Sequence, residues 1–361
     1  MVQDQDISVT EVPITNQSTS TRHNVEGALL VGIALVFYLA YALIPVIGGP
    51  LVILCPLPLI VLALRHPLRV VITGNMVATV LAGLLTGQPF AFITFLLVFS
   101  LPASAMGLSI RSGLSAKSVI LLGGTAMVAG SIGLFFITIG TVGEVDSIDS
   151  LKYIFKSGVE KQKVLLADKI REQGVTEGWP DKKIETLIEG NEKMLESLGQ
   201  MFWKTLPAAL ILGFLLESLI NYLVAGAVLK RLGYSIPKLG KFLEFKLPWY
   251  SVWLLICTIA FLAGGRKFNL DWMDTIGLNL QVVATILFFV HGLAIVLFFV
   301  ERLRARMKAG RFPVYLILTS VFFMFNAFAF MLTAFLGIYD LYFDFRNRVN
   351  ISPISPGAEE N

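Results

Sequence analysis

The chain has 361 residues, of which 55% are hydrophobic and 15% charged, and its net charge is +4. A soluble globular domain carries about 25% charged residues, so this chain has more apolar surface than a water-soluble fold buries. The charges gather between apolar runs of about 20 residues, the length that crosses a bilayer. The basic residues lie at the ends of these runs, which excludes nucleic acid as a partner and favours the lipid bilayer. The composition therefore predicts an all-α, polytopic helical membrane protein.

Apolar segments follow a polar stretch, residues 1–25, that is predicted to be a disordered tail. The first five make a predicted N-terminal membrane core within residues 26–142, and four more make a C-terminal membrane region within residues 205–340. Residues 341–361 are predicted to be a second polar tail. The segments lie at 26–44, 50–64, 68–86, 88–109, 118–142, 205–229, 249–265, 275–300 and 313–339.

The second segment, residues 50–64, leaves the number of crossings open. Its 15 residues would rise about 22 Å as a helix, less than the roughly 30 Å of a bilayer core. It also contains Pro56 and Pro58. A thin span gives nine transmembrane helices and a cytoplasmic N-terminus, which we favour. A re-entrant segment gives eight transmembrane helices and an N-terminus outside.

Lysine and arginine set the predicted orientation, because loops on the cytoplasmic side are enriched in both. The loops expected there contain Arg22, Arg65, Arg69, Arg111, Lys117, Lys230, Arg231, Lys238, Lys241, Lys246, Arg302, Arg304, Arg306, Lys308 and Arg311. The short loops on the opposite side contain only Arg266 and Lys267. The pattern predicts a multi-pass protein whose C-terminus is extracytoplasmic.

Residues 143–204 form the large hydrophilic stretch of the chain. Apolar side chains recur at near-helical spacing in 149–172 and again in 181–202, and Pro180 suits the first turn of the second arm. We predict an extracytoplasmic, amphipathic helical hairpin. Its apolar faces could pair with each other, lie on the membrane or dock a partner, and we favour pairing.

No catalytic motif is found in the sequence. It has no Walker A loop, no GxSxG elbow, no HExxH and no CxxC pair. With three histidines, and with Cys55 and Cys257 far apart, a zinc site is not expected. We expect neither an enzyme nor a cofactor.

Polar residues inside the apolar segments are the candidate functional residues, since a charge at that depth is costly. Glu217 and Asn221, four residues apart, share a helix face, and His291 and Asn326 lie within later segments. One hypothesis is that these four residues meet in a polar cavity that binds a small ligand or a proton. The alternative is a structural set of interhelical hydrogen bonds, which is also our interpretation of Asn75.

A second polar group lies at the predicted extracytoplasmic end of the 275–300 segment. Asn279 and Gln281 are close to that end, and Arg266, Asp271 and Asp274 lie in the loop before it. We expect these side chains to be solvated.

Short motifs spread along the chain carry a family resemblance. They are Cys55-Pro56-Leu57-Pro58-Leu59, Leu64-Arg65-His66-Pro67-Leu68-Arg69, Asn221-Tyr222, Lys230-Arg231-Leu232-Gly233, Phe245-Lys246-Leu247-Pro248, Gly337-Ile338-Tyr339-Asp340 and Asp344-Phe345-Arg346. With them the chain resembles the YybS-like family of bacterial membrane proteins, which has no assigned function, over nearly all of residues 26–348.

That family is similar at fold level to the S components of energy-coupling-factor transporters. The resemblance implies a bacterial cytoplasmic (inner) membrane protein that binds or transports a small molecule, with ATP-driven transporter subunits as partners. S components are shorter and lack an insert like residues 143–204. The alternative is therefore a non-transporting scaffold or regulator that binds envelope or cytoplasmic proteins through the hairpin or the basic loops.

Overall fold

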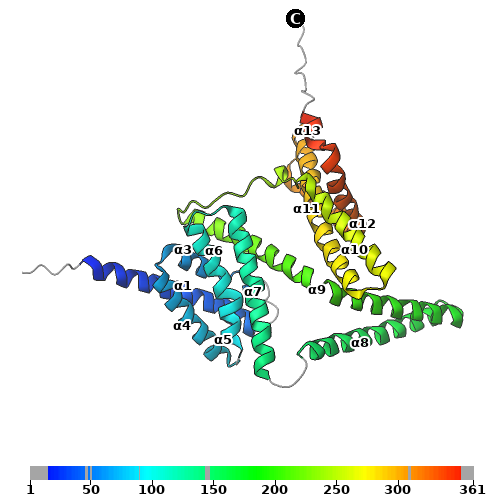
Figure 1. The fold of residues 1–361 in the computed structure, drawn as a ribbon, viewed down its shortest axis with the longest axis horizontal. Helices are drawn as coiled ribbons and strands as arrows, with labels where there is room; N and C mark the ends of the chain where they lie inside the picture. The colour runs from blue at the N-terminus through cyan, green and yellow to red at the C-terminus, as the bar shows by residue number, and fades with distance from the viewer. Residues whose placement is uncertain are drawn as a thin grey trace, which may run out of the picture. The chain divides into compact units, whose positions relative to one another are not determined.

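The computed structural model describes residues 15–44, 48, 51–88, 90–142, 147–307 and 310–350, some of them, including Asn326, by their backbone alone. Throughout these ranges the regular structure is helical, with no strand, which confirms the all-α prediction (Figure 1). The chain divides into two compact units. Unit 1 comprises Met1–Val145 and Gly213–Lys238, and unit 2 comprises Asp146–Leu212 and Leu239–Asn361.

Unit 1 contains six α-helices, a π-helix and the last part of a long helix, α9, within its described residues. They are α1 (Thr15–Leu43), α3 (Pro56–Arg65), α4 (Leu68–Thr86), α5 (Ala91–Thr94), the π-helix η1 (Phe95–Ser100), α6 (Leu101–Arg111), α7 (Ala116–Val142) and α9 (Asp181–Arg231). The close helix pairs in this unit are α3 with α6, α6 with α7, and α1 with α4.

The segment predicted at 50–64 contains the short helix α3, which is enclosed by protein. Its residues Pro56–Ala63 are all buried, and ten residues rise only about 15 Å. Gly107 of α6 permits this burial, because a Cβ there would come within 2.5 Å of the Ile60 carbonyl oxygen. As a helix, α3 alone is too short to cross a bilayer.

Seven helices in the described residues are long and apolar enough to cross a membrane. They are Asn24–Leu43, Leu68–Thr86, Ala91–Arg111, Ala116–Thr138, Asp181–Arg231, Trp249–Phe268 and Asp271–Met307. Two shorter apolar helices, Pro56–Arg65 and Ala327–Phe343, fall in the other two predicted segments. The chain is a polytopic helical membrane protein, and each predicted apolar segment contains helix.

Unit 2 contains the remaining elements. They are α8 (Ser147–Thr176), the first part of α9, the 3₁₀ turns η2 (Phe242–Glu244) and η3 (Trp249–Ser251), α10 (Val252–Phe268), α11 (Asp271–Met307), α12 (Arg311–Phe343) and α13 (Phe345–Asn350). The helix α11 packs against α10 and against α12.

The hydrophilic insert forms a helical hairpin from α8 and the start of α9. The Lys163 ammonium lies 2.7 Å from Glu196 on the opposite arm and 3.0 Å from Glu160 on its own. Phe155 stacks on Phe202 with 4.9 Å between ring centroids. The two arms therefore contact each other, as the favoured interpretation predicts, whereas the side of the membrane on which the hairpin lies stays a prediction.

Glycines set the close packing of α11 and α12. A Cβ on Gly292 of α11 would overlap the Thr333 carbonyl oxygen, and a Cβ on Gly337 of α12 would overlap the Phe288 carbonyl oxygen. Small residues let membrane helices approach closely. This approach brings the end of α12 against the middle of α11, where His291 lies.

Candidate functional site

Three ionisable side chains meet inside unit 2. His291 comes from α11, Asp340 from the last turn of α12 and Arg346 from α13, and we call them the buried cluster. The His291 Nε2 atom lies 3.1 Å from Asp340 Oδ2 and 3.1 Å from Arg346 Nη2. Arg346 Nη2 lies 3.4 Å from the same carboxylate oxygen. His291 and Asp340 are fully buried, and Arg346 is 8% exposed.

The turn after α12 explains how Asp340 and Arg346 come together. Asp344 ends α12 in the left-handed conformation, with a φ of 44°, which aspartate adopts more readily than most residues. The chain then reverses, and the Phe345 amide donates to Asp340 Oδ1 over 2.7 Å. One Asp340 oxygen therefore fixes the turn, while the other faces His291 and Arg346.

The segment before α10 closes the cluster on another side. Arg346 Nη1 donates to the Leu243 carbonyl over 2.8 Å, and Lys246 pairs with Asp344 at 2.7 Å. The Phe245 ring lies edge-on to His291, with 6.4 Å between centroids. Three motifs of the family resemblance, at 245–248, 337–340 and 344–346, thus meet at His291.

The hydrogen-bond partner of His291 depends on whether its Nε2 atom carries a proton. With a proton on Nε2, the ring can donate to Asp340. The same N–H then faces the Arg346 guanidinium, which has donors and no acceptor. Without that proton, Nε2 accepts from Arg346 but faces a carboxylate with its lone pair. The other ring nitrogen, Nδ1, is buried and has no hydrogen-bond partner among the described residues. The buried cluster can therefore change its pairing when His291 gains or loses a proton.

Sequence reasoning located one member of this cluster. It selected His291 but assigned Asp340 to a span end and Arg346 to the polar tail. A usable signal was present, because both residues lie in motifs that carry the family resemblance.

The other predicted site residues are not members of the buried cluster. Asn221 of α9 is fully buried, and neither its Oδ1 nor its Nδ2 has a hydrogen-bond partner among the described residues. Glu217, one turn earlier, is partly buried. Both belong to unit 1, whereas His291 belongs to unit 2. Asn326 lies on α12, and its side chain is outside the described residues. A cavity formed by these four residues stays a prediction.

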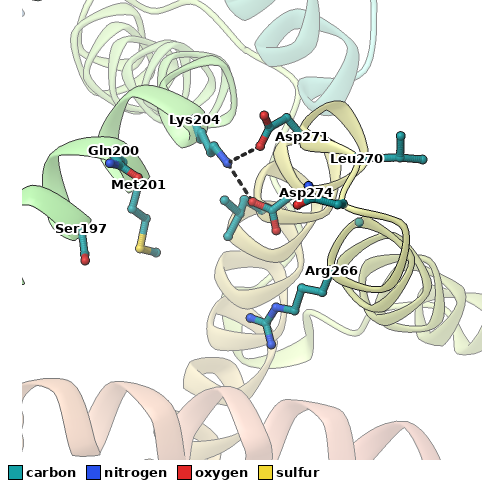
Figure 2. Close-up of a pocket in the computed structure, with 11 residues that line it drawn as sticks. Ser197, Gln200, Met201, Lys204, Arg266, Leu270, Asp271 and Asp274 are labelled. Atoms are coloured by element: carbon teal, nitrogen blue, oxygen red, sulfur yellow. Dashed lines mark hydrogen bonds and ion pairs between the residues drawn. The ribbon is translucent and has the colours of Figure 1, made fainter.

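A second polar site in unit 2 is an open cleft of about 520 Å³ between α9 and the turn that joins α10 to α11. Figure 2 shows Lys204 pointing from α9 toward Asp271 and Asp274. Arg266, near the end of α10, also lines the cleft. The Lys204 ammonium lies 2.9 Å from Asp274 and 3.6 Å from Asp271. The loop charges that we expected to be solvated are therefore partly joined in ion pairs.

Asn279 is likewise not a solvated side chain, because it completes the backbone of α9. Its Oδ1 accepts from the Ala208 amide over 2.9 Å, and its Nδ2 donates to the Lys204 carbonyl over 2.6 Å. These two backbone groups would bond each other in an uninterrupted α-helix. Pro207 lies inside the helix, and a proline ring disturbs this ladder. The side-chain amide of Asn279 thus provides hydrogen-bond partners for two backbone groups at the kink in α9.

One motif of the family resemblance in unit 1, Leu64–Arg69, contacts residues on other helices. Arg65, at the end of α3, pairs with Glu26 of α1 at 2.5 Å and lies over the Tyr234 ring at 5.5 Å. The Arg111 guanidinium donates to the His66 carbonyl over 2.8 Å. This motif therefore joins α1, α3 and α6 at one end of unit 1.

Comparison with known proteins places the chain in a family. Residues 32–341 match the model of the family described as predicted membrane protein (DUF2232), and the chain belongs to this family. It is also similar to the uncharacterized protein YybS of Bacillus subtilis (strain 168), with 25% identity over 334 residues that cover 91% of this chain and 99% of that protein. No solved structure matches the chain. The family assignment confirms the YybS-like resemblance and a membrane protein, and it assigns no function.

Proposed function

We propose that this membrane protein binds or transports a small molecule, with the buried cluster as its polar site. The observation that carries the proposal is the meeting of His291, Asp340 and Arg346 at buried positions beside the apolar helices α11 and α12. Ionisable groups in such surroundings mark ligand, ion or proton pathways in membrane proteins. The proposal assigns no catalytic step to the site.

A purely structural role is the competing explanation. Structural bonds between membrane helices are commonly made by neutral hydroxyl and amide groups and contribute about 0.6–2 kcal/mol each. The buried cluster instead uses two charged groups and a histidine, and the His291 Nε2 atom faces an acceptor and a donor at once. A site that exchanges a proton or a polar ligand requires such alternative pairings.

The proposed setting is the cytoplasmic membrane of a bacterium, with ATP-driven transporter subunits as partners. Affinity purification of the tagged full chain from its native membrane, followed by mass spectrometry, tests this. Recovery of an ATPase pair together with a transmembrane coupling subunit supports a transporter component. Recovery of envelope assembly proteins in their place contradicts it.

A scaffold or regulator is the second candidate, and the hairpin of α8 and α9 favours it. Large apolar side chains are exposed on these polar helices, among them Tyr153, Val164, Val175 and Leu198. Deleting 150–200 separates the two candidates. A scaffold loses function with this deletion and tolerates changes in the buried cluster. A protein that binds a small molecule at the cluster loses function when the cluster is changed.

The side of the C-terminus also requires a direct test. Charge counting supports an extracytoplasmic C-terminus and a cytoplasmic segment before α10. The ion pair of Lys246 with Asp344 joins these two segments, and so requires them on one side. Labelling of Lys246→Cys and Asp344→Cys with a membrane-impermeant maleimide, in a Cys55→Ser/Cys257→Ser background, decides between the two arrangements.

A further inference from the structure

Unit 1 contains a set of buried side-chain oxygens that have no hydrogen-bond partner among the described residues. Asn75 and Thr79 lie one turn apart on α4, and Ser100 ends the π-helix η1. They are 9%, 5% and 1% exposed. Asn75 Oδ1, Thr79 Oγ1 and Ser100 Oγ have no hydrogen-bond partner among the described residues. Buried polar groups are nearly always hydrogen-bonded, so three unpartnered oxygens require an explanation.

The packing of α4 against α5 and η1, with one hydrogen bond from α4 to α6, sets the register of these residues. Asn75 Nδ2 donates to Ser104 Oγ over 2.7 Å, and at the other end of the pair a Cβ on Gly83 would lie 3.1 Å from Phe92. The helices are thus antiparallel. Thr79 is one turn forward from Asn75, and Ser100 is one turn back from Ser104. The antiparallel register therefore places Thr79 opposite Ser100 in the same seam. We call these four residues the α4–α6 seam.

The hydroxyl of Thr79 behaves differently from its neighbours on the same helix. Thr73 and Thr86 each donate to the carbonyl four residues earlier, over 2.9 and 2.7 Å, which is the common arrangement for threonine in membrane helices. Thr79 makes no such bond among the described residues. Its oxygen is therefore available to a group in the seam.

The backbone at the seam is also unusual. Phe95–Ser100 is a π-helix, a rare form that is frequently found at functional sites. Tyr38 covers it, with ring centroids 5.1 Å from Phe95 and 5.5 Å from Phe99. The widened turn, shielded by aromatic rings, carries Ser100 at its end.

We propose that the α4–α6 seam binds a sodium ion through the oxygens of Asn75, Thr79 and Ser100. Their oxygens are neutral, which favours a monovalent ion, because Ca²⁺ and Mg²⁺ sites rely on carboxylates. Sodium sites in transporters combine neutral oxygens with irregular helix at membrane depth. The oxygens have almost no surface open to water, so the seam suits a single small ion rather than an organic ligand.

The test compares the thermal stability of the purified full chain in Na⁺ and in K⁺ at constant ionic strength. A ligand of the native state raises the melting temperature with its concentration, and we expect Na⁺ to raise it by at least about 2 °C over K⁺. Thr79→Val and Ser100→Ala should abolish the difference. Thr73→Val and Thr86→Val, whose hydroxyls bond their own helix, should retain it.

Binding of ²²Na⁺ to the wild-type chain covers the case in which a seam variant fails to fold. Saturable binding that unlabelled Na⁺ displaces and K⁺ does not displace supports the site. The proposal is overturned if wild type shows neither Na⁺-specific stabilisation nor ²²Na⁺ binding, as expected if the oxygens are hydrated by water alone. It is also overturned if Thr79→Val and Ser100→Ala, folded, keep the full Na⁺ effect.

Discussion

Neutralising Asp340 tests the energetics of the buried cluster. Asp340→Asn keeps an oxygen that can accept from the Phe345 amide, which now takes 2.7 Å to Oδ1. It removes the charge that faces His291 and Arg346. The guanidinium, 8% exposed, would then lack the Asp340 carboxylate and keep two neutral neighbours, the Leu243 carbonyl and the His291 ring.

The expected cost of this substitution is large. Removing one partner of a buried ion pair destabilises by about 3–5 kcal/mol, because it leaves a buried charge uncompensated. Replacing both charges by neutral groups of similar size is often nearly neutral. We therefore expect Asp340→Asn to lower the free energy of unfolding by about 3–5 kcal/mol, and the double variant Asp340→Asn/Arg346→Met to recover at least about 2 kcal/mol of that loss.

The measurement is reversible unfolding of the purified chain in mixed micelles, for wild type, both single variants and the double variant. The cycle isolates the coupling between the two side chains. A cost below about 1 kcal/mol for Asp340→Asn, or costs of the two single changes that simply add, would refute the assignment of a buried, coupled pair.

Three further predictions concern packing and the hairpin. Gly292→Ala places a Cβ on a carbonyl of α12 and should cost about 1–3 kcal/mol in the same assay, whereas Gly32→Ala, with open space around it, should be neutral within about 0.5 kcal/mol. Asn279→Ala leaves two backbone groups of α9 without their partners, and faster amide exchange at this kink should follow; unchanged exchange would contradict the role of the amide. The hydrogen bonds that Lys163 donates, first to Glu196 and then to Glu160, raise the pKa of its ammonium group. The ion pair of Lys163 with Glu196 should persist at pH values below the ordinary lysine pKa of about 10.4. It should weaken as the pH rises through the raised pKa of Lys163. Proteolysis of the hairpin should increase there in wild type, and Lys163→Met should remove this pH dependence.

The helical membrane architecture was predictable from the sequence because its cause is local. Apolar runs of bilayer length force the backbone to satisfy its own hydrogen bonds, and in a single run only a helix does so. The short segment 50–64 was less certain, since its length and prolines left a thin span and a re-entrant segment open, and we favoured the span. Its burial against Gly107 depends on a partner helix, which periodicity does not identify.

The candidate site was predictable only in part, for a related reason. His291 stands out as a polar residue in an apolar run. Asp340 and Arg346 do not, because residues at the end of an apolar segment are normally solvated. Their burial arises from the left-handed turn at Asp344 and from a segment about 100 positions earlier in the chain, at Leu243. The amide of Asn279 was misread in the same way, because its partner is a proline kink in α9 rather than water.

The most direct test of the proposed role of the buried cluster is ligand-dependent thermal stabilisation of the purified full chain. A panel of small polar metabolites, each at several pH values, would be applied to wild type and to Asp340→Asn/Arg346→Met, which we expect to stay folded. The proposed function predicts a compound that raises the melting temperature of wild type and leaves the double variant unchanged. Equal stabilisation of both proteins, or no stabilisation of wild type by any compound, would contradict it.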